Sequence, residues 1–155
     1  MSYAKRIGIL ISVLASAAAI AAYFIFQPKS PGFRLPDTPE KFQLAEQQAH
    51  CAGIYVILRA SLKQENPNYK ELESNYSGAL ERHSTAALKL FFDHERTQMQ
   101  IERASRDFVK SLEMALARKE DLRDIFDAKE SECIDVEFKT LAFIQRERQS
   151  YAESR

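Results

Sequence analysis

The chain of 155 residues has little glycine and little proline: four glycines and five prolines, none of the prolines beyond Pro67. Such a composition favours long helices over strands joined by tight turns. The glycines are too few for a phosphate-binding loop or a dinucleotide fingerprint, and no G-x-S-x-G, C-x-x-C-H or H-E-x-x-H motif occurs. The sequence therefore predicts an all-α protein that is not an enzyme and holds no cofactor.

The sequence also has no excess of positive or negative charge. The 22 lysines and arginines balance the 22 aspartates and glutamates. The basic residues form no patch or stripe along the sequence, and such a patch is the usual footprint of a nucleic-acid-binding protein. Mixed charges of this kind are typical of solvated helix faces. We therefore expect no nucleic-acid partner.

Only three histidines are available to hold a metal ion: His50, His83 and His94. Neither His83 nor His94 follows a glutamate by three residues, as the di-iron sites of helical bundles require. Glu46 and His50 share one helix face, but a single pair is a weak signal. We therefore predict no metal site. A metal- or ligand-sensing bundle stays an alternative. It would need at least two of the histidines to converge on one pocket, with Met99 as a further candidate ligand.

One long apolar run is present, residues 7–26, directly after Lys5 and Arg6. As a helix it is about 30 Å long, the thickness of the hydrocarbon core of a bilayer. A cleaved signal peptide is the alternative, with its cleavage site among the alanines of the run. Tyr23 and Phe24 favour an anchor, because cleavage before them would leave an aromatic tail in water, whereas such side chains suit the membrane interface.

The anchor is expected to divide the chain into a cytoplasmic tail (1–6), a transmembrane segment (7–26), a proline-rich linker (27–37) and a periplasmic helical domain (38–155). Basic residues flank the run on both sides, so the short tail favours an N-terminus inside the cell. The predicted location is the bacterial inner membrane, which the chain would cross once. The layout resembles small bacterial envelope proteins with one anchor and a helical domain, in architecture and not in motifs.

Small residues follow one face of the predicted anchor, where Gly8, Ser12 and Ser16 recur at four-residue spacing. Faces of this kind let membrane helices approach one another closely. The motif is short, and an alanine-rich segment also shows such spacing by chance. It leaves open a homo-oligomer packed through the membrane helix.

Four helices are expected after the linker, and with short loops they form an antiparallel up-down four-helix bundle. The alternative is a three-helix arrangement, in which the second and third helices are one long central helix. Asp93 is the expected break, because it interrupts the apolar periodicity and suits a helix cap. The fourth helix is the most apolar and is expected at the centre of the packing. The expected ranges are about 39–64, 68–91, 94–118 and 121–155.

The two cysteines, Cys51 and Cys133, distinguish these arrangements. In the up-down bundle each lies about 12 residues from the start of its helix, so both fall at mid-height on antiparallel neighbours. With one long central helix they would be about 30 Å apart, beyond the reach of a disulfide. An exported domain favours a disulfide between two level cysteines, and we predict a Cys51–Cys133 bond. Two buried free thiols are the alternative.

Because the sequence has a predicted membrane anchor and no catalytic or cofactor motif, it predicts a binding or scaffolding role. The anchor would hold the bundle beside a protein partner in or near the membrane, as in an accessory subunit of a membrane complex. Two alternatives stand beside this prediction. One is the metal- or ligand-sensing periplasmic bundle. The other is a phage-lysis or envelope-spanning coiled-coil protein, which would favour an unbroken central helix and no intrachain disulfide.

Overall fold

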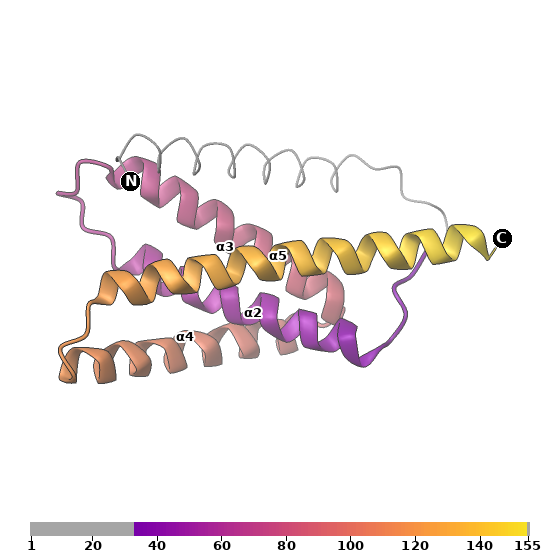
Figure 1. The fold of residues 1–155 in the computed structure, drawn as a ribbon, viewed down its shortest axis with the longest axis horizontal. Coiled ribbons are helices and arrows are strands. Elements are labelled where there is room, and N and C mark those ends of the chain that lie inside the picture. Colours follow the sequence, from indigo (N-terminus) through magenta and orange to yellow (C-terminus); the bar gives the residue numbers. More distant parts are fainter. Residues whose placement is uncertain (1–32, 155) are drawn as a thin grey trace. The chain divides into compact units, whose positions relative to one another are not determined.

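The computed structural model describes residues 33–154, which contain four α-helices and no strand (Figure 1). The predicted all-α class is confirmed. Residues Arg34–Arg155 form one compact unit. The helices are α2 (Pro39–Ala60), α3 (Tyr69–Phe91), α4 (His94–Ala117) and α5 (Leu122–Glu153).

The predicted membrane anchor, residues 7–26, lies outside the described residues, together with the tail before it and the small-residue face of Gly8, Ser12 and Ser16. Within residues 33–154, no helix combines the length and the apolar character that crossing a bilayer requires. The anchor, its orientation and the inner-membrane address therefore stay predictions from the sequence.

Side-chain caps explain where two of the helices begin. The Thr38 hydroxyl accepts a hydrogen bond from the backbone N–H of Lys41 at 3.2 Å, and Pro39 takes the first position of α2. Asp121 accepts a hydrogen bond from the N–H of Arg123 at 2.9 Å at the start of α5. Both starts agree with the expected ranges.

The break between α3 and α4 follows from two adjacent residues. Phe92 adopts a left-handed backbone with φ of 54° and ends α3. Asp93 then caps α4 by accepting a hydrogen bond from the N–H of Arg96 at 2.9 Å. The predicted break at Asp93 is confirmed, and the alternative with one long central helix is wrong.

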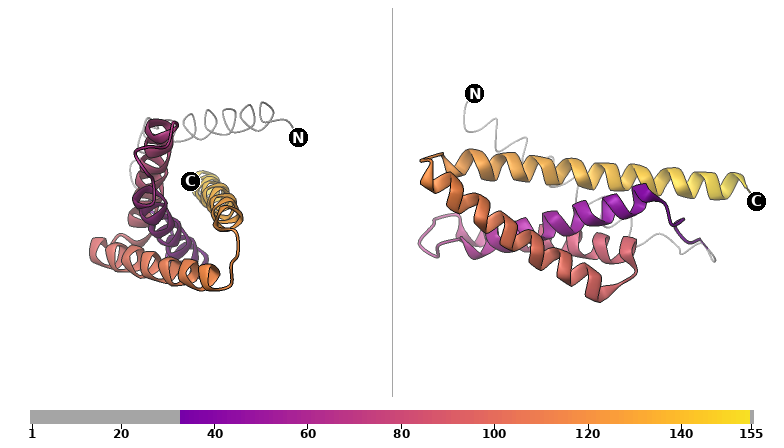
Figure 2. Two further views of the ribbon diagram at one scale, coloured as in Figure 1. Left: turned by 90° about the vertical axis from the view of Figure 1, so that its left-hand side faces the viewer. Right: turned by 90° about the horizontal axis from the view of Figure 1, so that it is seen from below.

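Each helix runs opposite to the one before it, as Figure 1 shows. The helix α2 packs against all three of the others, whereas α4 and α5 scarcely meet (Figure 2). Eleven of the 22 residues of α2 are buried, against four of the 32 residues of α5. The prediction that the fourth helix lies at the centre is therefore wrong, because α2 takes that place.

Small residues explain why α2 is central. A Cβ atom added at Gly53 would lie 2.6 Å from the Cβ of Ala104 and 2.7 Å from the carbonyl oxygen of Ile101, so α4 crosses α2 with backbones nearly touching. In α5, by contrast, the ring of Phe138 is 52% exposed. Three further small residues of α2 are fully buried: Ala45, Ala49 and Ala52.

Among residues 33–154, two apolar clusters make up the core, and α2 contributes to both. Leu35, which precedes α2 in the expected linker, packs against the second cluster. The first cluster surrounds the two cysteines and includes Ile54, Tyr55, Leu58, Phe108 and Val136. The second includes Leu44, Leu90, Phe91 and Phe143.

Candidate functional site

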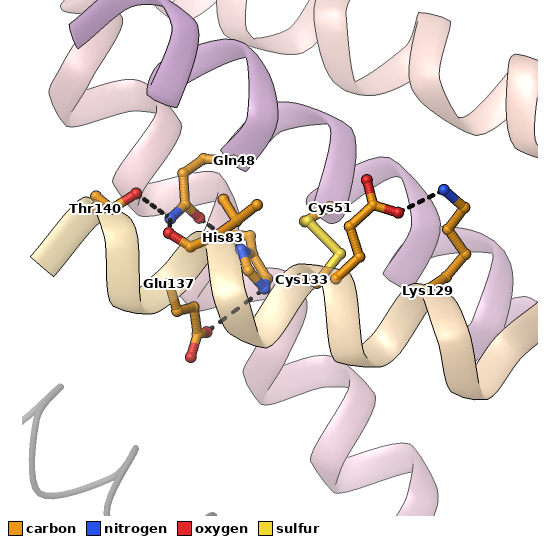
Figure 3. Close-up of a disulfide and its surroundings, with 9 residues drawn as sticks. Gln48, Cys51, His83, Lys129, Cys133, Glu137 and Thr140 are labelled. Atoms are coloured by element: carbon orange, nitrogen blue, oxygen red, sulfur yellow. Dashed lines mark hydrogen bonds and ion pairs between the residues drawn. A yellow bond between two sulfur atoms is a disulfide. The ribbon is translucent and has the colours of Figure 1, made fainter. Parts of the chain in front are cut away.

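A disulfide bond joins Cys51 of α2 to Cys133 of α5, with 5.5 Å between the two Cα atoms (Figure 3). The predicted bond is confirmed, and both cysteines are buried. Only three other residues of α5 are buried, namely Val136, Thr140 and Phe143. The disulfide therefore ties α5 covalently to α2 within a narrow strip of buried side chains.

A chain of buried polar side chains lies beside the disulfide (Figure 3). The amide nitrogen of Gln48 donates to the Thr140 hydroxyl at 2.8 Å and to the carbonyl oxygen of Val136 at 3.4 Å. These two acceptors fix the orientation of the amide, so its oxygen faces Nδ1 of His83. We assign the proton of the imidazole to Nδ1, which donates to Gln48, and the lone pair to Nε2.

The other ring nitrogen of His83 faces a carboxylate. Its Nε2 atom lies 3.5 Å from Oε1 of Glu137, an oxygen that also accepts a hydrogen bond from Arg82 at 2.9 Å. The ring of Tyr55 stacks on the imidazole, with 5.4 Å between the centroids. Burial, and to a lesser degree the charge of Arg82, lowers the pKa of His83 to about 3. The imidazole is therefore neutral at pH 7, with its lone pair on Nε2, and Arg82 holds Oε1 of Glu137 beside it.

The same histidine lies close to both cysteines. One ligand atom from each of Cys51, His83 and Cys133 lies within 4.8 Å of the other two. The remaining candidates from the sequence do not join them: His50 lines a groove on α2, while His94 and Met99 are exposed on α4. Within residues 33–154, the histidines do not converge on one pocket.

Sequence reasoning missed the polar side chains that lie beside the disulfide, Gln48, Glu137 and Thr140. Gln48 precedes Cys51 by three residues, and Glu137 and Thr140 follow Cys133 by four and seven. Residues at these spacings share a helix face. Following that face outward from each cysteine would have found all three side chains.

A groove of about 280 Å³ lies between α4 and α5, above one face of α2. The α2 face presents polar side chains at helical spacing, Gln43, Glu46, Gln47 and His50, followed by Cys51. Glu46 and His50 thus do share a face, as the sequence indicated. The groove forms because α4 and α5 both pack on α2 and scarcely contact each other.

The charges of the groove are already paired. Each carboxylate that lines it has a basic partner: Glu46 with Arg96 at 3.5 Å, Asp107 with Arg103 at 3.8 Å, and Glu132 with Lys129 at 2.6 Å. Burial, followed by the charge of Lys129, lowers the pKa of His50, so this side chain is also uncharged at pH 7. The groove therefore carries little net charge.

Four hydrogen-bonding side chains of the groove have no such partner. Gln43, Gln47 and His50 from α2 and Gln100 from α4 form no side-chain hydrogen bond to another described residue. An amide side chain offers both donors and an acceptor. These groups remain free to bind a molecule that enters the groove.

No protein-family model, no curated protein and no solved structure matches the chain. Function is therefore inferred from the residues of the chain alone.

Proposed function

We propose that this protein is a membrane-held binding protein whose helical domain docks a polypeptide segment of a protein partner in the groove between α4 and α5. The observation that carries the proposal is the set of free hydrogen-bonding side chains there, Gln43, Gln47, His50 and Gln100. Amide groups that both donate and accept match the N–H and C=O groups of an extended backbone.

The paired charges support a polypeptide over a small ion. An unpaired carboxylate or guanidinium group would favour a ligand of opposite charge, whereas here each carboxylate has its own basic partner. Cys51, Ala104 and Val136 add apolar surface inside the groove, on which a side chain of the bound segment can pack. A neutral, amide-lined groove with an apolar base suits a segment recognised mainly through its backbone.

The predicted anchor at residues 7–26 complements this groove. Tethering to a membrane raises the effective concentration of the domain near partners in the same membrane, so a modest docking surface suffices. We place the domain in the bacterial periplasm, where a disulfide such as Cys51–Cys133 persists. The protein would then act there as a scaffold or accessory subunit of a membrane complex.

An envelope-spanning coiled coil fits less well. That alternative favoured an unbroken central helix and no intrachain disulfide, whereas the described residues show a break at Asp93 and a Cys51–Cys133 bond. A sensor built on converging histidines also lacks its site within these residues, since the groove contains only His50.

Site-specific photocrosslinking in cells tests the docking groove. A photoreactive phenylalanine analogue at Gln47 of the full-length protein is expected to give a discrete crosslinked protein, which mass spectrometry then identifies. The matched control carries the same analogue at Glu81, which is exposed on α3 outside the groove.

The groove side chains supply the specificity control. With the analogue at Gln43, the double substitution Gln47→Ala, Gln100→Ala is expected to lower the crosslink yield roughly 30-fold, because the two lost hydrogen bonds cost about 1 kcal/mol each. Equal crosslinks from Gln47 and Glu81, or a yield that the double substitution leaves unchanged, would rule out docking in this groove.

A further inference from the structure

The cluster of Cys51, Cys133 and His83 brings together three ligands of the two types that zinc prefers, thiolate and imidazole. Their ligand atoms lie within 4.8 Å of one another, all three residues are buried, and they come from three different helices. Structural zinc sites hold a tetrahedral set of thiolates and imidazoles. We propose that the dithiol form of this protein is a zinc site, in which Cys51, Cys133 and His83 bind Zn²⁺ and Glu137 supplies the fourth ligand.

The hydrogen bond between His83 and Gln48 supports this zinc site independently. Zinc-binding histidines almost always donate their second ring N–H to a carbonyl or carboxylate, which fixes the tautomer and aims the free nitrogen at the metal. Here Nδ1 donates to the amide oxygen of Gln48, whose own N–H group is held by Thr140. The lone pair of Nε2 is thereby fixed in a buried position, ready to bind a cation.

The fourth ligand follows from the position of Glu137 beside the free ring nitrogen of His83. Glu137 lies one helical turn after Cys133 on the same face of α5, and its Oε1 lies 3.5 Å from Nε2 of His83 (Figure 3). Nitrogen and oxygen ligands of one tetrahedral zinc, at about 2.0–2.1 Å from the metal, lie about 3.3 Å apart, so one ion can be bound by both of these atoms. Oε1 also accepts the hydrogen bond of Arg82, and the carboxylate has a second oxygen, so binding zinc through Oε1 would transfer Arg82 to Oε2.

The distance between the two cysteines suits both the disulfide and the proposed zinc-bound form. Two sulfurs bound to one zinc at about 2.3 Å in a tetrahedron lie about 3.8 Å apart. With 5.5 Å between the Cα atoms of Cys51 and Cys133, side-chain rotation accommodates this separation. The charges also balance, since Zn²⁺ with two thiolates and the Glu137 carboxylate carries one negative charge, which Arg82 offsets.

The switch between the two states is a thiol–disulfide exchange. An external dithiol supplies two electrons and two protons, the bond between Cys51 and Cys133 breaks to give two thiols, and the external dithiol becomes a disulfide. Zn²⁺ then replaces the two thiol protons, which pass to water. Cys51 lines the groove between α4 and α5, so the reductant approaches from that side. This inference does not rest on the docking function of the groove.

Cobalt spectroscopy of the full-length protein tests the site. The protein is purified in detergent, reduced with a phosphine and titrated with Co²⁺. We expect one Co²⁺ per chain, with thiolate-to-cobalt charge-transfer absorption and the intense visible bands of a tetrahedral site, all displaced by Zn²⁺. The disulfide-bonded protein is expected to show none of these bands.

Four variants separate the proposed ligands from neighbouring residues. Cys133→Ser is expected to abolish the charge-transfer band of the tetrahedral site. His83→Gln and Glu137→Gln are each expected to lower the affinity about tenfold or more, the range found when ligand shells are disturbed. His50→Gln is the matched control, because His50 neighbours Cys51 and lies in the groove but is not part of the cluster.

If reduction of the disulfide unfolds the domain, circular dichroism provides a second test of zinc binding. In that case Zn²⁺ is expected to restore the helical signal of the wild-type protein and not that of His83→Gln. A reduced protein with neither a thiolate–cobalt band nor a zinc-dependent gain of helix would contradict the proposal. Binding that is lost in Cys133→Ser but unchanged in His83→Gln would also contradict it, since the cysteines alone would then hold the metal.

Discussion

Helices α2 and α5 both carry many apolar residues, yet half of α2 is buried and only four of the 32 residues of α5 are. The difference lies in the size of the residues. Glycine and alanine in α2 let other helices approach on several sides, whereas large side chains of α5 such as Phe138 extend into solvent. The comparison shows that close approach of backbones, rather than the number of apolar residues, selects the central helix.

The two helices are also held in different ways. Contacts with three other helices stabilise α2, while α5 is held by one narrow contact strip that includes the disulfide and the hydrogen bonds of Gln48 with Thr140 and Val136. The open side of that strip is the groove, where the free amides lie. Loose packing of α5 thus creates the surface to which we assign docking.

Loss of the disulfide is expected to have the largest effect on stability. The cysteines lie 82 residues apart, and the loop-entropy relation gives about 4.5 kcal/mol for a loop of that size. The double substitution Cys51→Ala, Cys133→Ala is expected to lower the free energy of unfolding by that amount in urea denaturation followed by circular dichroism. A loss below about 1 kcal/mol would mean that packing alone holds α5.

Gly53→Ala tests the close approach that makes α2 central. The new Cβ would lie 2.6–2.8 Å from atoms of α4, two of them backbone atoms, so the helices must move apart. We expect a loss of about 3 kcal/mol, as for overpacked cores. The matched control is Gly78→Ala on α3, where the nearest atom is the end of the Arg82 side chain at 3.5 Å.

The substitutions of the two glycines are expected to change the free energy of unfolding in opposite directions. Gly78→Ala is expected to raise the free energy of unfolding by about 0.5–1 kcal/mol, because alanine favours the helix over glycine and meets no obstacle. Thermal and urea unfolding measured side by side give both values. Equal effects of the two substitutions would show that the crossing of α2 and α4 is looser than described.

Acid is expected to weaken the domain through His83. Its pKa is about 3 in the folded protein and about 6.5 in the unfolded chain, so the unfolded chain binds the proton first as the pH falls. The stabilisation is complete above pH 6.5 and is lost as the pH falls towards 3. Between pH 7 and pH 5 the disulfide-bonded protein is expected to lose about 2 kcal/mol from this group.

Substitutions of the two histidines separate the contribution of His83 to the pH dependence of stability from that of His50. Burial lowers the pKa of His50 too, which adds to the loss, and it raises the pKa of Glu130, which acts in the opposite direction at lower pH. His83→Gln should flatten the dependence between pH 7 and pH 5 far more than His50→Gln does. Equal slopes in the wild-type protein and His83→Gln would show that His83 is not held neutral by the fold.

Local chemistry and helical geometry made much of the fold predictable. A cap such as Asp93 acts on its own neighbours, and the level of Cys51 and Cys133 follows from the helical rise and the loop lengths. The central position of α2 was not predictable in the same way, because it depends on which backbones meet at Gly53. The groove and the Gln48–His83 contact likewise arise only when three helices are placed together.

Hydrogen exchange of the full-length protein, oxidised and then reduced in the presence of a chelator, tests most directly whether α2 is the central helix and α5 is held to it by Cys51–Cys133. We predict that amides of residues 45–58 exchange most slowly in both states, and that reduction accelerates exchange in α5 by a much larger factor than in α2. Equal protection of α5 and α2 in the oxidised protein, or equal acceleration of both on reduction, would contradict this description of the domain.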